Sequence, residues 1–226
     1  MLKLNDLKGE YKNAINQVVC CDCLEMMKMM PDKCVDLVLT DPPYGLNFSY
    51  LSYDDTRENL KNLIKEFMPE VLRIGKRAAV LCGITQISLY PEPDWIMSII
   101  WNTTGSFGKY GYTQWMPILL YGDDLKGFGN VNGITKSDII KISGGGGVGF
   151  TRNDLEKEHT CPKPITIMDK VVQRLSNEKD VILDCFSGSG STLVSAKNLN
   201  RNYIGIEKEE KYCEISRQRL RQQNLI

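Results

Sequence analysis

The chain has 226 residues, of which 42% are hydrophobic and 25% charged, as is ordinary for a soluble globular protein. Its 28 basic and 28 acidic residues balance, which argues against a protein held on nucleic acid mainly by bulk positive charge, although a local basic face is allowed. No apolar run is long enough for a membrane helix and residues 1–13 lack a signal peptide's apolar core, so we expect one cytoplasmic domain over 1–226 with no membrane partner.

The cysteines do not indicate a metal site. The chain has eight of them, and without an export signal we expect reduced thiols. Cys20, Cys21 and Cys23 cluster, but no second pair follows at ligand spacing, and the single histidine, His159, is distant in sequence. Because a zinc site needs about four ligands, we predict no metal.

The first half of the chain alternates short apolar runs with amphipathic stretches. The expected strands lie at 15–20, 35–40 and 78–82. The expected helices lie at 24–30 and 57–73. The runs 95–101 and 116–121 predict an antiparallel pair of strands at one edge of a sheet.

Basic residues gather on and after the second helix. Arg57, Lys61 and Lys65 share one helical face, and Arg73, Lys76 and Arg77 follow. Such residues suit phosphate binding, but a solvated helix face is the favoured interpretation.

Regular patterning stops between 122 and 158. This segment is rich in Gly, Asn and Asp and contains four consecutive glycines at 144–147, which order poorly in helices or strands. It is predicted to be a mobile or ligand-ordered loop or a short insertion, with a passive linker as the alternative.

Alternation resumes after this segment. Helices are expected at 164–175, 191–199 and 209–223, and strands at 181–184 and 203–207. Strands that alternate with helices predict an α/β fold whose mainly parallel sheet is covered on both faces.

A glycine-rich loop follows the strand at 181–184. Gly188 and Gly190 permit a tight turn with close backbone approach, and Ser191-Thr192 can cap the next helix. Glu207 ends the following strand, where a carboxylate can accept hydrogen bonds from a ribose diol. The loop is neither a GxGxxG fingerprint nor a P-loop, so it predicts a nucleoside-type cofactor of another kind.

A second unusual loop, Asp41-Pro42-Pro43-Tyr44, ends the strand at 35–40. The two prolines stiffen it and remove two N–H donors. A carboxylate, a fixed carbonyl and an aromatic ring suit a planar molecule that carries an NH₂ group. Asp41 and the Pro42 carbonyl would accept the two N–H bonds of a base amine and aim its lone pair at a methyl donor, while Tyr44 stacks on the extruded base. A proline-stiffened structural turn is the alternative.

These loops resemble those of the amino-methyltransferases that modify DNA. Residues 41–44 match the family's [DNS]-P-P-[YFW] motif, and 183–192 are similar to its D-x-F-x-G-S-G-T cofactor loop. The catalytic loop comes first, as in the family's β group, in which target recognition is usually inserted between the two halves. The resemblance covers about 18–121 and 159–225 and implies a Rossmann-like S-adenosylmethionine-dependent methyltransferase fold.

Two further segments resemble cofactor motifs of the same family. Residues 21–25 are similar to G-D-[CA]-[LF]-E, whose Asp contacts the adenine ring, and 159–164 to H-[PST]-x-x-K-P, whose His and Lys lie near the methionine part. The resemblance implies Asp41, Pro42, Pro43 and Tyr44 as the catalytic set. It also implies S-adenosylmethionine as the cofactor, bound by Cys21, Asp22, Cys23, Asp41, His159, Lys163, Pro164, Asp184, Phe186, Ser187, Gly188, Ser189, Gly190, Ser191, Thr192 and Glu207.

The sequence departs from the family pattern at a few points. Cys21 stands for the usual Gly and Ser191 for the usual Thr, which leaves the tightness of cofactor binding open. Residues 122–158 are short for a recognition insertion, so the DNA site would be short, or recognition would depend on a homodimer.

The acceptor predicted from the resemblance is the N6 amine of adenine in DNA, because relatives with D-P-P-Y lean towards adenine and those with S-P-P-Y towards cytosine. The alternatives are N4 of cytosine, an RNA or protein amine, and an inactive binding subunit. Methylation at C5 of cytosine would need a Pro-Cys nucleophile, which the chain lacks. Transfer would be direct, without a metal. The family implies a prokaryotic or phage-borne enzyme acting in the cytoplasm.

Overall fold

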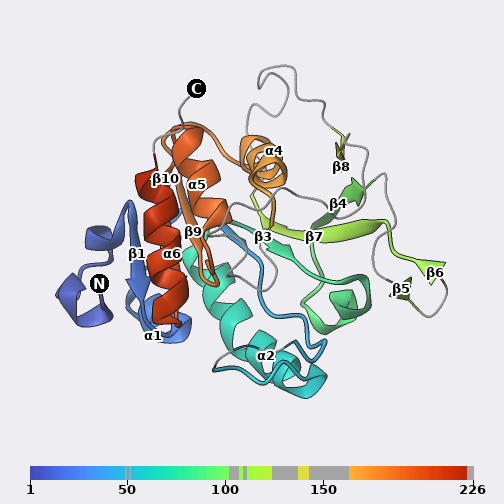
Figure 1. Ribbon diagram of the computed structural model, residues 1–226, viewed down its shortest axis with the longest axis horizontal. Coiled ribbons are helices and arrows are strands. Elements are labelled where there is room, and N and C mark those ends of the chain that lie inside the picture. The colour runs from blue at the N-terminus through green and yellow to red at the C-terminus, as the bar shows by residue number, and fades with distance from the viewer. Residues whose placement is uncertain are drawn as a thin grey trace.

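The computed structural model describes residues 1–48, 50, 52–101, 107–108, 111–123, 137–142 and 163–222. The main sheet has eight strands in the order β1-β10-β9-β2-β3-β7-β4-β8, and Figure 1 shows helices packed against it. Its strands are β1 (Gln17–Cys20), β2 (Leu37–Thr40), β3 (Arg77–Leu81), β4 (Trp95–Trp101), β7 (Trp115–Gly122), β8 (Ile139–Ile142), β9 (Val181–Asp184) and β10 (Asn202–Glu207). A separate two-stranded ribbon joins β5 (Phe107–Gly108) to β6 (Gly111–Tyr112).

The sheet is mostly parallel. The five strands from β1 to β3 in that order run in one direction, β7 is antiparallel to both its neighbours, and β8 is parallel to β4. The predicted α/β class and the antiparallel pairing of β4 with β7 are therefore confirmed.

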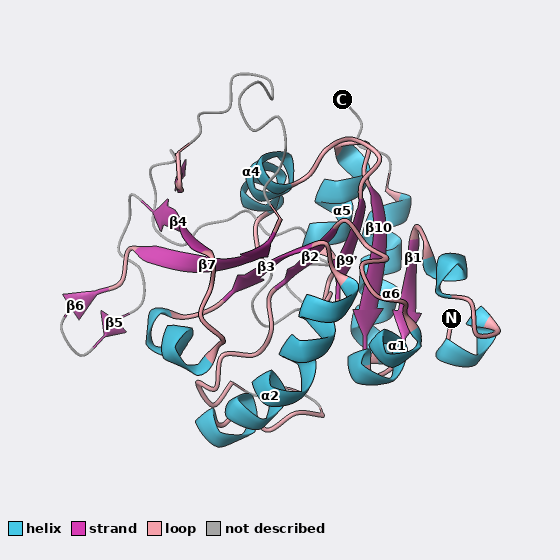
Figure 2. Ribbon diagram, turned by 180° about the vertical axis from the view of Figure 1, so that it is seen from behind, coloured by secondary structure: helices cyan, strands magenta, loops and turns pink. Residues whose placement is uncertain are grey.

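Helices cover both faces of the sheet. Helices α1 (Cys23–Met29) and α2 (Arg57–Ile74) belong to one core, and α4 (Ile165–Leu175), α5 (Ser191–Asn198) and α6 (Glu210–Arg221) to the core on the other side (Figures 1 and 2). Short 3₁₀ turns complete the described structure at η1 (Leu4–Leu7), η2 (Tyr11–Ala14) and η3 (Ile84–Leu89). No helix in the described ranges is long and apolar enough to cross a membrane.

The local sequence explains these elements. All four residues of β2 are buried, as expected of a central parallel strand that is covered on both faces. Helix α2 starts at Thr56, whose side chain accepts a hydrogen bond from the Asn59 N–H, and Leu60, Ile64 and Phe67 supply its buried stripe.

The connections make a switch point between β9 and β2. From β9 the chain passes through α5 to β10 on one side, and from β2 it passes through α2 to β3 on the other. The loops after these neighbouring strands diverge, and such a place at the carboxyl edge of a sheet is where α/β proteins bind ligands. Thr40 Oγ1 donates a 2.8 Å hydrogen bond to Asp184 Oδ1 and joins the two strand ends.

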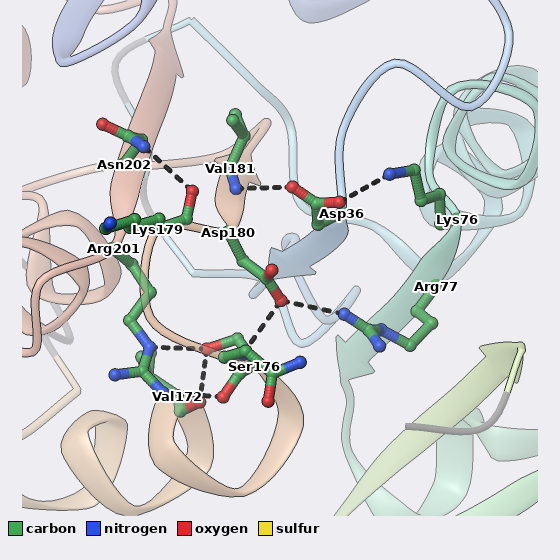
Figure 3. A network of polar contacts seen from close by, with 11 residues as sticks. Asp36, Lys76, Arg77, Val172, Ser176, Lys179, Asp180, Val181, Arg201 and Asn202 are labelled. Carbon is green, nitrogen blue, oxygen red and sulfur yellow. Dashed lines mark hydrogen bonds and ion pairs between the residues drawn. The ribbon is translucent and has the colours of Figure 1, made fainter. Parts of the chain in front are cut away.

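A polar network fastens the opposite, amino edge of the sheet (Figure 3). Asp36 accepts bonds from Lys76 Nζ at 2.7 Å and the Val181 N–H at 2.8 Å, and Asp180 accepts from Arg77 at 3.0 Å. Buried Arg201 donates to the Ser176 carbonyl at 2.7 Å and to its hydroxyl at 3.0 Å. These bonds join the amino ends of β2, β3 and β9 to one another and connect the start of β10 to the end of α4.

The basic residues at the end of α2 are engaged within the chain. Arg73 pairs with Asp32 and Glu70, and Lys76 and Arg77 belong to the network just described. At the start of the helix, Lys61 pairs with Glu58. Lys61, Arg73, Lys76 and Arg77 therefore each have an acidic partner within the chain.

Some elements were not predicted. The expectation of no regular structure over 122–158 is wrong at β8, where the β-branched run Ile139–Ile142 pairs with β4 and buries Ile140. The edge of the sheet is therefore β8 and not the pair of β4 and β7. Residues 124–136 and 143–158, which include the four glycines, lie outside the described residues.

Arg201, in the amino-edge network, should be important for stability. The replacement Arg201→Met preserves side-chain bulk but leaves the Ser176 and Leu199 carbonyls without this donor. We expect the free energy of unfolding, measured by urea denaturation, to fall by about 2–4 kcal/mol. Arg221→Met in the exposed last turn of α6 is the control and should cost less than about 0.5 kcal/mol. Equal losses in the two variants would contradict this assignment.

Candidate active site

A cavity of about 240 Å³ lies at the switch point. Its wall brings together the loop after β2, the glycine-rich loop after β9, the end of β10 and the start of α1. The predicted residues in this wall are Cys21, Asp22, Cys23, Asp41, Pro42, Pro43, Tyr44, Lys163, Asp184, Phe186, Ser187, Gly188, Ser189, Ser191, Thr192 and Glu207.

Three predicted residues are not in this wall. Pro164 is the N-cap of α4, and Gly190 faces α6, where an added Cβ would lie 2.2 Å from Ser216 Oγ. His159 lies outside the described residues.

Asp41 already has a donor on each carboxylate oxygen. The Tyr44 hydroxyl donates to Oδ1 at 2.6 Å, and Lys163 Nζ donates to Oδ2 at 2.5 Å. The Lys163 ammonium also lies 5.2 Å from the centroid of the Tyr44 ring. Lys163, which the resemblance places near the methionine part of a cofactor, is thus bonded to the Asp-Pro-Pro-Tyr loop.

Tyr44 is held from several sides. Its hydroxyl also contacts Met116 Sδ at 3.2 Å, and its carbonyl accepts a 2.9 Å bond from the buried Gln86 side chain. Burial, followed by the negative charge of Asp41, raises the pKa of the Tyr44 phenol well above its ordinary value. The phenol therefore stays protonated at neutral pH and remains a donor to Asp41.

The glycine-rich loop folds back on the end of β10. Gly188 and Gly190 have positive φ angles of 49° and 81°, and the Gly188 N–H donates to Glu207 Oε2 at 2.9 Å. The other oxygen of Glu207 accepts from the Glu209 N–H at 2.8 Å. Burial raises the pKa of Glu207, and the backbone donors oppose that effect.

The start of α5 differs from the prediction. Gly190 is its N-cap and no side chain caps the first turn, so the expected capping by Ser191 and Thr192 is wrong. The reason is that both side chains turn inward. Thr192 bonds to Asp184, and buried Arg219 of α6 donates to Ser191 Oγ at 3.3 Å and to the Ser189 carbonyl at 2.8 Å. Arg219 thereby supports the loop from behind.

The end of the cavity next to α1 combines apolar and acidic groups. Asp22 caps α1 by accepting a bond from the Leu24 N–H at 2.9 Å, and its second oxygen lies 3.5 Å from Lys208 Nζ. Phe186 lines this wall and packs edge-on against Phe67, with ring centroids 5.3 Å apart. In the described part of the chain no cluster of metal-ligating side chains occurs, and the seven described cysteines are free thiols.

A second cavity, of about 490 Å³, is larger but contains none of the predicted site residues. It lies at the amino edge of the sheet between Arg77, Trp95 and Arg174. The smaller cavity is the candidate active site because it combines the switch point with both unusual loops.

Sequence reasoning missed several residues of the site. The cavity is also lined by Leu24, Phe48, Tyr50, Ser52, Tyr53, Leu63, Met168, Cys185, Lys208, Glu209 and Tyr212. The aromatic residues at 48, 50 and 53 follow the catalytic loop so closely that their density was an available signal. Gln86 carried no motif, because its role depends on the contact between η3 and the loop after β2.

The fold and the cavity define the class of protein: a Rossmann-like methyltransferase fold with its ligand cavity at the switch point. Comparison with known proteins supports this assignment. The crystal structure of the PvuII cytosine-N4-specific DNA methyltransferase superposes with a TM-score of 0.69 at 15% identity, covering 92% of this chain and 87% of that one. The M1.HpyAVI–SAM complex gives 0.62 at 22% identity, covering 91% and 99%.

Sequence comparison points to the same class of protein. Residues 130–218 match the N6/N4 family described as DNA methylase. The type II methyltransferase M.HpaI of Haemophilus parainfluenzae is 29% identical over 90% of this chain and 74% of its own length. By sequence the chain is thus similar to the N6/N4 DNA methylase family and to type II DNA methyltransferases.

The buried carboxyl at the end of β9 gives a pH-dependent prediction. Burial raises the pKa of Asp184 from 3.8 to about 6, against the lowering effect of its hydrogen bonds. The folded protein therefore holds this proton more tightly than the unfolded chain. This carboxyl favours folding fully below about pH 4, and the contribution is lost as the pH rises through about 6.

The replacement Asp184→Asn should remove that dependence. Relative to wild type, its free energy of unfolding should rise between pH 4 and 7, by about 1.4 kcal/mol for each unit of pKa shift. Urea denaturation at several pH values measures the difference. A difference that does not change with pH would show that Asp184 titrates normally.

Proposed function

We propose that this protein is a DNA amino-methyltransferase that transfers a methyl group from S-adenosylmethionine to the N6 amine of adenine in DNA. The observation that carries the proposal is the position of Asp41-Pro42-Pro43-Tyr44 in one cavity with the glycine-rich loop and Glu207. Adenine is favoured over cytosine because Asp, rather than Ser, opens the motif. The PvuII enzyme, whose fold is similar, is named as specific for N4 of cytosine, so fold alone does not choose between the bases.

The residues in the cavity suit an adenosyl cofactor. Glu207 uses one lone pair of each oxygen for a backbone N–H, which leaves others for the hydroxyls of a ribose. In the same wall Ser187 Oγ is buried and has no hydrogen-bond partner among the residues that the structure describes, and Phe186 offers an apolar surface for a ring. When bound, S-adenosylmethionine supplies an electrophilic methyl group on positively charged sulfur. The solved complex of M1.HpyAVI with SAM supports this choice.

Asp41 would orient the base amine. An exocyclic amine is a poor nucleophile because its lone pair is delocalised into the ring, and hydrogen bonds to its two N–H groups favour a tetrahedral nitrogen. The Asp41 oxygens keep lone pairs beyond those used by Tyr44 and Lys163. Among the described residues no donor bonds to the Pro42 carbonyl, so it can accept the second N–H. Catalysis then rests on positioning and fixed dipoles.

Tyr44 would hold the target base. Because the Lys163 ammonium lies over the ring, a base stacks on the opposite face unless Lys163 moves. The bonds from Tyr44 to Asp41 and from Gln86 to the Tyr44 carbonyl fix the ring relative to the carboxylate. One rigid unit would thus bind both the face and the amine edge of the base.

We also propose that residues 122–158 contribute to target recognition within a single domain over 1–226. Strand β8 attaches the described part of this segment to the sheet edge. A homodimer would extend the contact with DNA beyond what one chain of this size covers, and sedimentation at low concentration tests for it.

Replacement of the catalytic carboxylate tests the mechanism. Asp41→Ala should lower kcat for methyl transfer to DNA by about a hundredfold or more, since a preorganised polar contact in a water-excluded site is lost. Binding of S-adenosylmethionine, measured by calorimetry, should change much less. Asp54→Ala, at a nearby exposed carboxylate, is the matched control and should retain activity. Unchanged turnover of Asp41→Ala would remove this residue from the mechanism.

The base assignment has its own test. DNA from cells that express this chain should carry N6-methyladenine at one short sequence, detected by single-molecule sequencing. Absence of that mark in cells that express Asp41→Ala is the control. If N4-methylcytosine were found instead, the acceptor in the proposal would be cytosine and not adenine. If the chain methylated neither base but did methylate RNA or protein, the proposal would be overturned.

A further inference from the structure

Two large apolar side chains are exposed directly after the catalytic loop. Leu46 is 51% exposed and Phe48 is 43% exposed, and Phe48 also lines the catalytic cavity. We call these two residues the apolar lip. Isolated exposed apolar residues are common, but here a pair lies within four residues of Tyr44 and at the edge of the site.

A buried carboxylate holds the lip in place. Asp55, which is 1% exposed, accepts hydrogen bonds from the N–H groups of Gly45 at 2.6 Å, Leu46 at 3.0 Å and Phe48 at 3.2 Å. Its own carbonyl accepts a fourth bond from the Asn47 N–H at 2.7 Å. One residue at the start of α2 thus binds four consecutive amides.

The segment is also fixed by packing. Gly45 has a positive φ of 66°, and a Cβ there would lie 3.0 Å from Arg57 Cα and 3.2 Å from Leu60 Cβ. The chain therefore passes tightly over the first turn of α2, and only a glycine suits this conformation.

Burial of the Asp55 carboxylate costs free energy, and the fold alone does not require this burial. Burying a carboxylate is unfavourable unless its hydrogen bonds compensate, and here those bonds serve a turn that keeps apolar side chains in water. Held by Asp55, the lip cannot fold back freely onto the core. A rigid, exposed aromatic ring at the mouth of a base-binding site suits stacking against an unstacked base.

We propose that the apolar lip is a DNA-contacting surface in which Phe48 stacks on a base at the mouth of the cavity, and that Asp55 is its positioning residue. The proposal rests on the proposed function, since it takes DNA as the substrate. It extends base contact beyond Tyr44 to a segment outside the catalytic motif.

The position of the lip favours a base over the cofactor as its partner. Phe48 follows the loop that carries Asp41 and Tyr44, whereas the groups suited to an adenosyl ligand lie after β9 and β10. Leu46 and Phe48 carry no charge and make the contact independent of phosphates. The basic residues Arg73, Lys76 and Arg77, which could bind phosphates, are instead engaged in ion pairs within the chain.

The first experiment replaces the ring. The probe is a duplex with the site that sequencing identifies, carrying 2-aminopurine at the target position. For Phe48→Ala we expect the Kd of this duplex to rise about tenfold, as for loss of one base–aromatic stack, and the fluorescence gain on binding to fall. The Kd of S-adenosylmethionine should stay within about twofold of wild type. Trp95→Ala, which removes a 61% exposed aromatic ring on β4, is the matched control.

The second experiment tests the positioning role. Asp55→Asn replaces one acceptor oxygen by an NH₂ group that cannot accept from an amide, so the lip should loosen. We expect a raised KM for DNA and a reduced 2-aminopurine signal, with the Kd of S-adenosylmethionine near that of wild type and the melting temperature lowered by only about 2–4 °C for the lost buried bond. Asp54→Asn, at the exposed neighbouring residue, should leave all four quantities unchanged. If Asp55→Asn lowered cofactor affinity and melting temperature as much as DNA affinity, its role would be structural and the positioning proposal would be wrong.

The outcomes separate this proposal from the function on which it rests. If the wild-type protein methylates DNA and the Phe48→Ala variant binds the duplex as wild type does, the proposed role of the apolar lip is wrong and the proposed function stands. A Phe48→Ala variant that loses cofactor affinity instead overturns the assignment of a base as its partner. Wild-type protein that methylates no DNA overturns the function itself, before any variant is compared.

Discussion

The pairing of β2 with β9 is the constraint on which the site depends. Their carboxyl ends carry the two loops with the chemical groups, and Thr40 donates a hydrogen bond to Asp184 across them. Without this pairing Asp41 and the glycine-rich loop would not share a cavity. The divergence of the two following helices opens the space between the loops, so the order of the strands provides the site.

Several acidic groups in the cavity wall have hydrogen-bond or ion-pair partners within the chain. Asp41 has Lys163 and Tyr44 as partners, Glu207 has two backbone donors, and Asp22 has the Leu24 amide with Lys208 nearby. Preformed bonds of this kind reduce the reorganisation that a bound substrate must cause. They also require any substrate amine to share or replace existing donors at Asp41.

Much of the fold and the site could be predicted because the signals are local. The apolar runs gave the parallel strands, and the Asp-Pro-Pro-Tyr and glycine-rich loops each stand out within a few residues. Strand β8 could not be predicted, because four residues have little periodicity and β4 decides their pairing. The roles of Asp55, Gln86 and Arg219 were likewise hidden, since each acts on a backbone segment that only the tertiary structure brings close.

The spacing of the two loops along the chain has a consequence for synthesis. Strand β2 leaves the ribosome more than a hundred residues before β9, its neighbour in the middle of the sheet. The edge of β2 that β9 will cover carries unpaired backbone groups during this interval, and long-range pairing of this kind is slow and exposed to aggregation. A growing chain therefore carries Asp41-Pro42-Pro43-Tyr44 early but has no assembled cavity until the last third is made. By topology alone, an unfinished chain lacks the site that both loops form together.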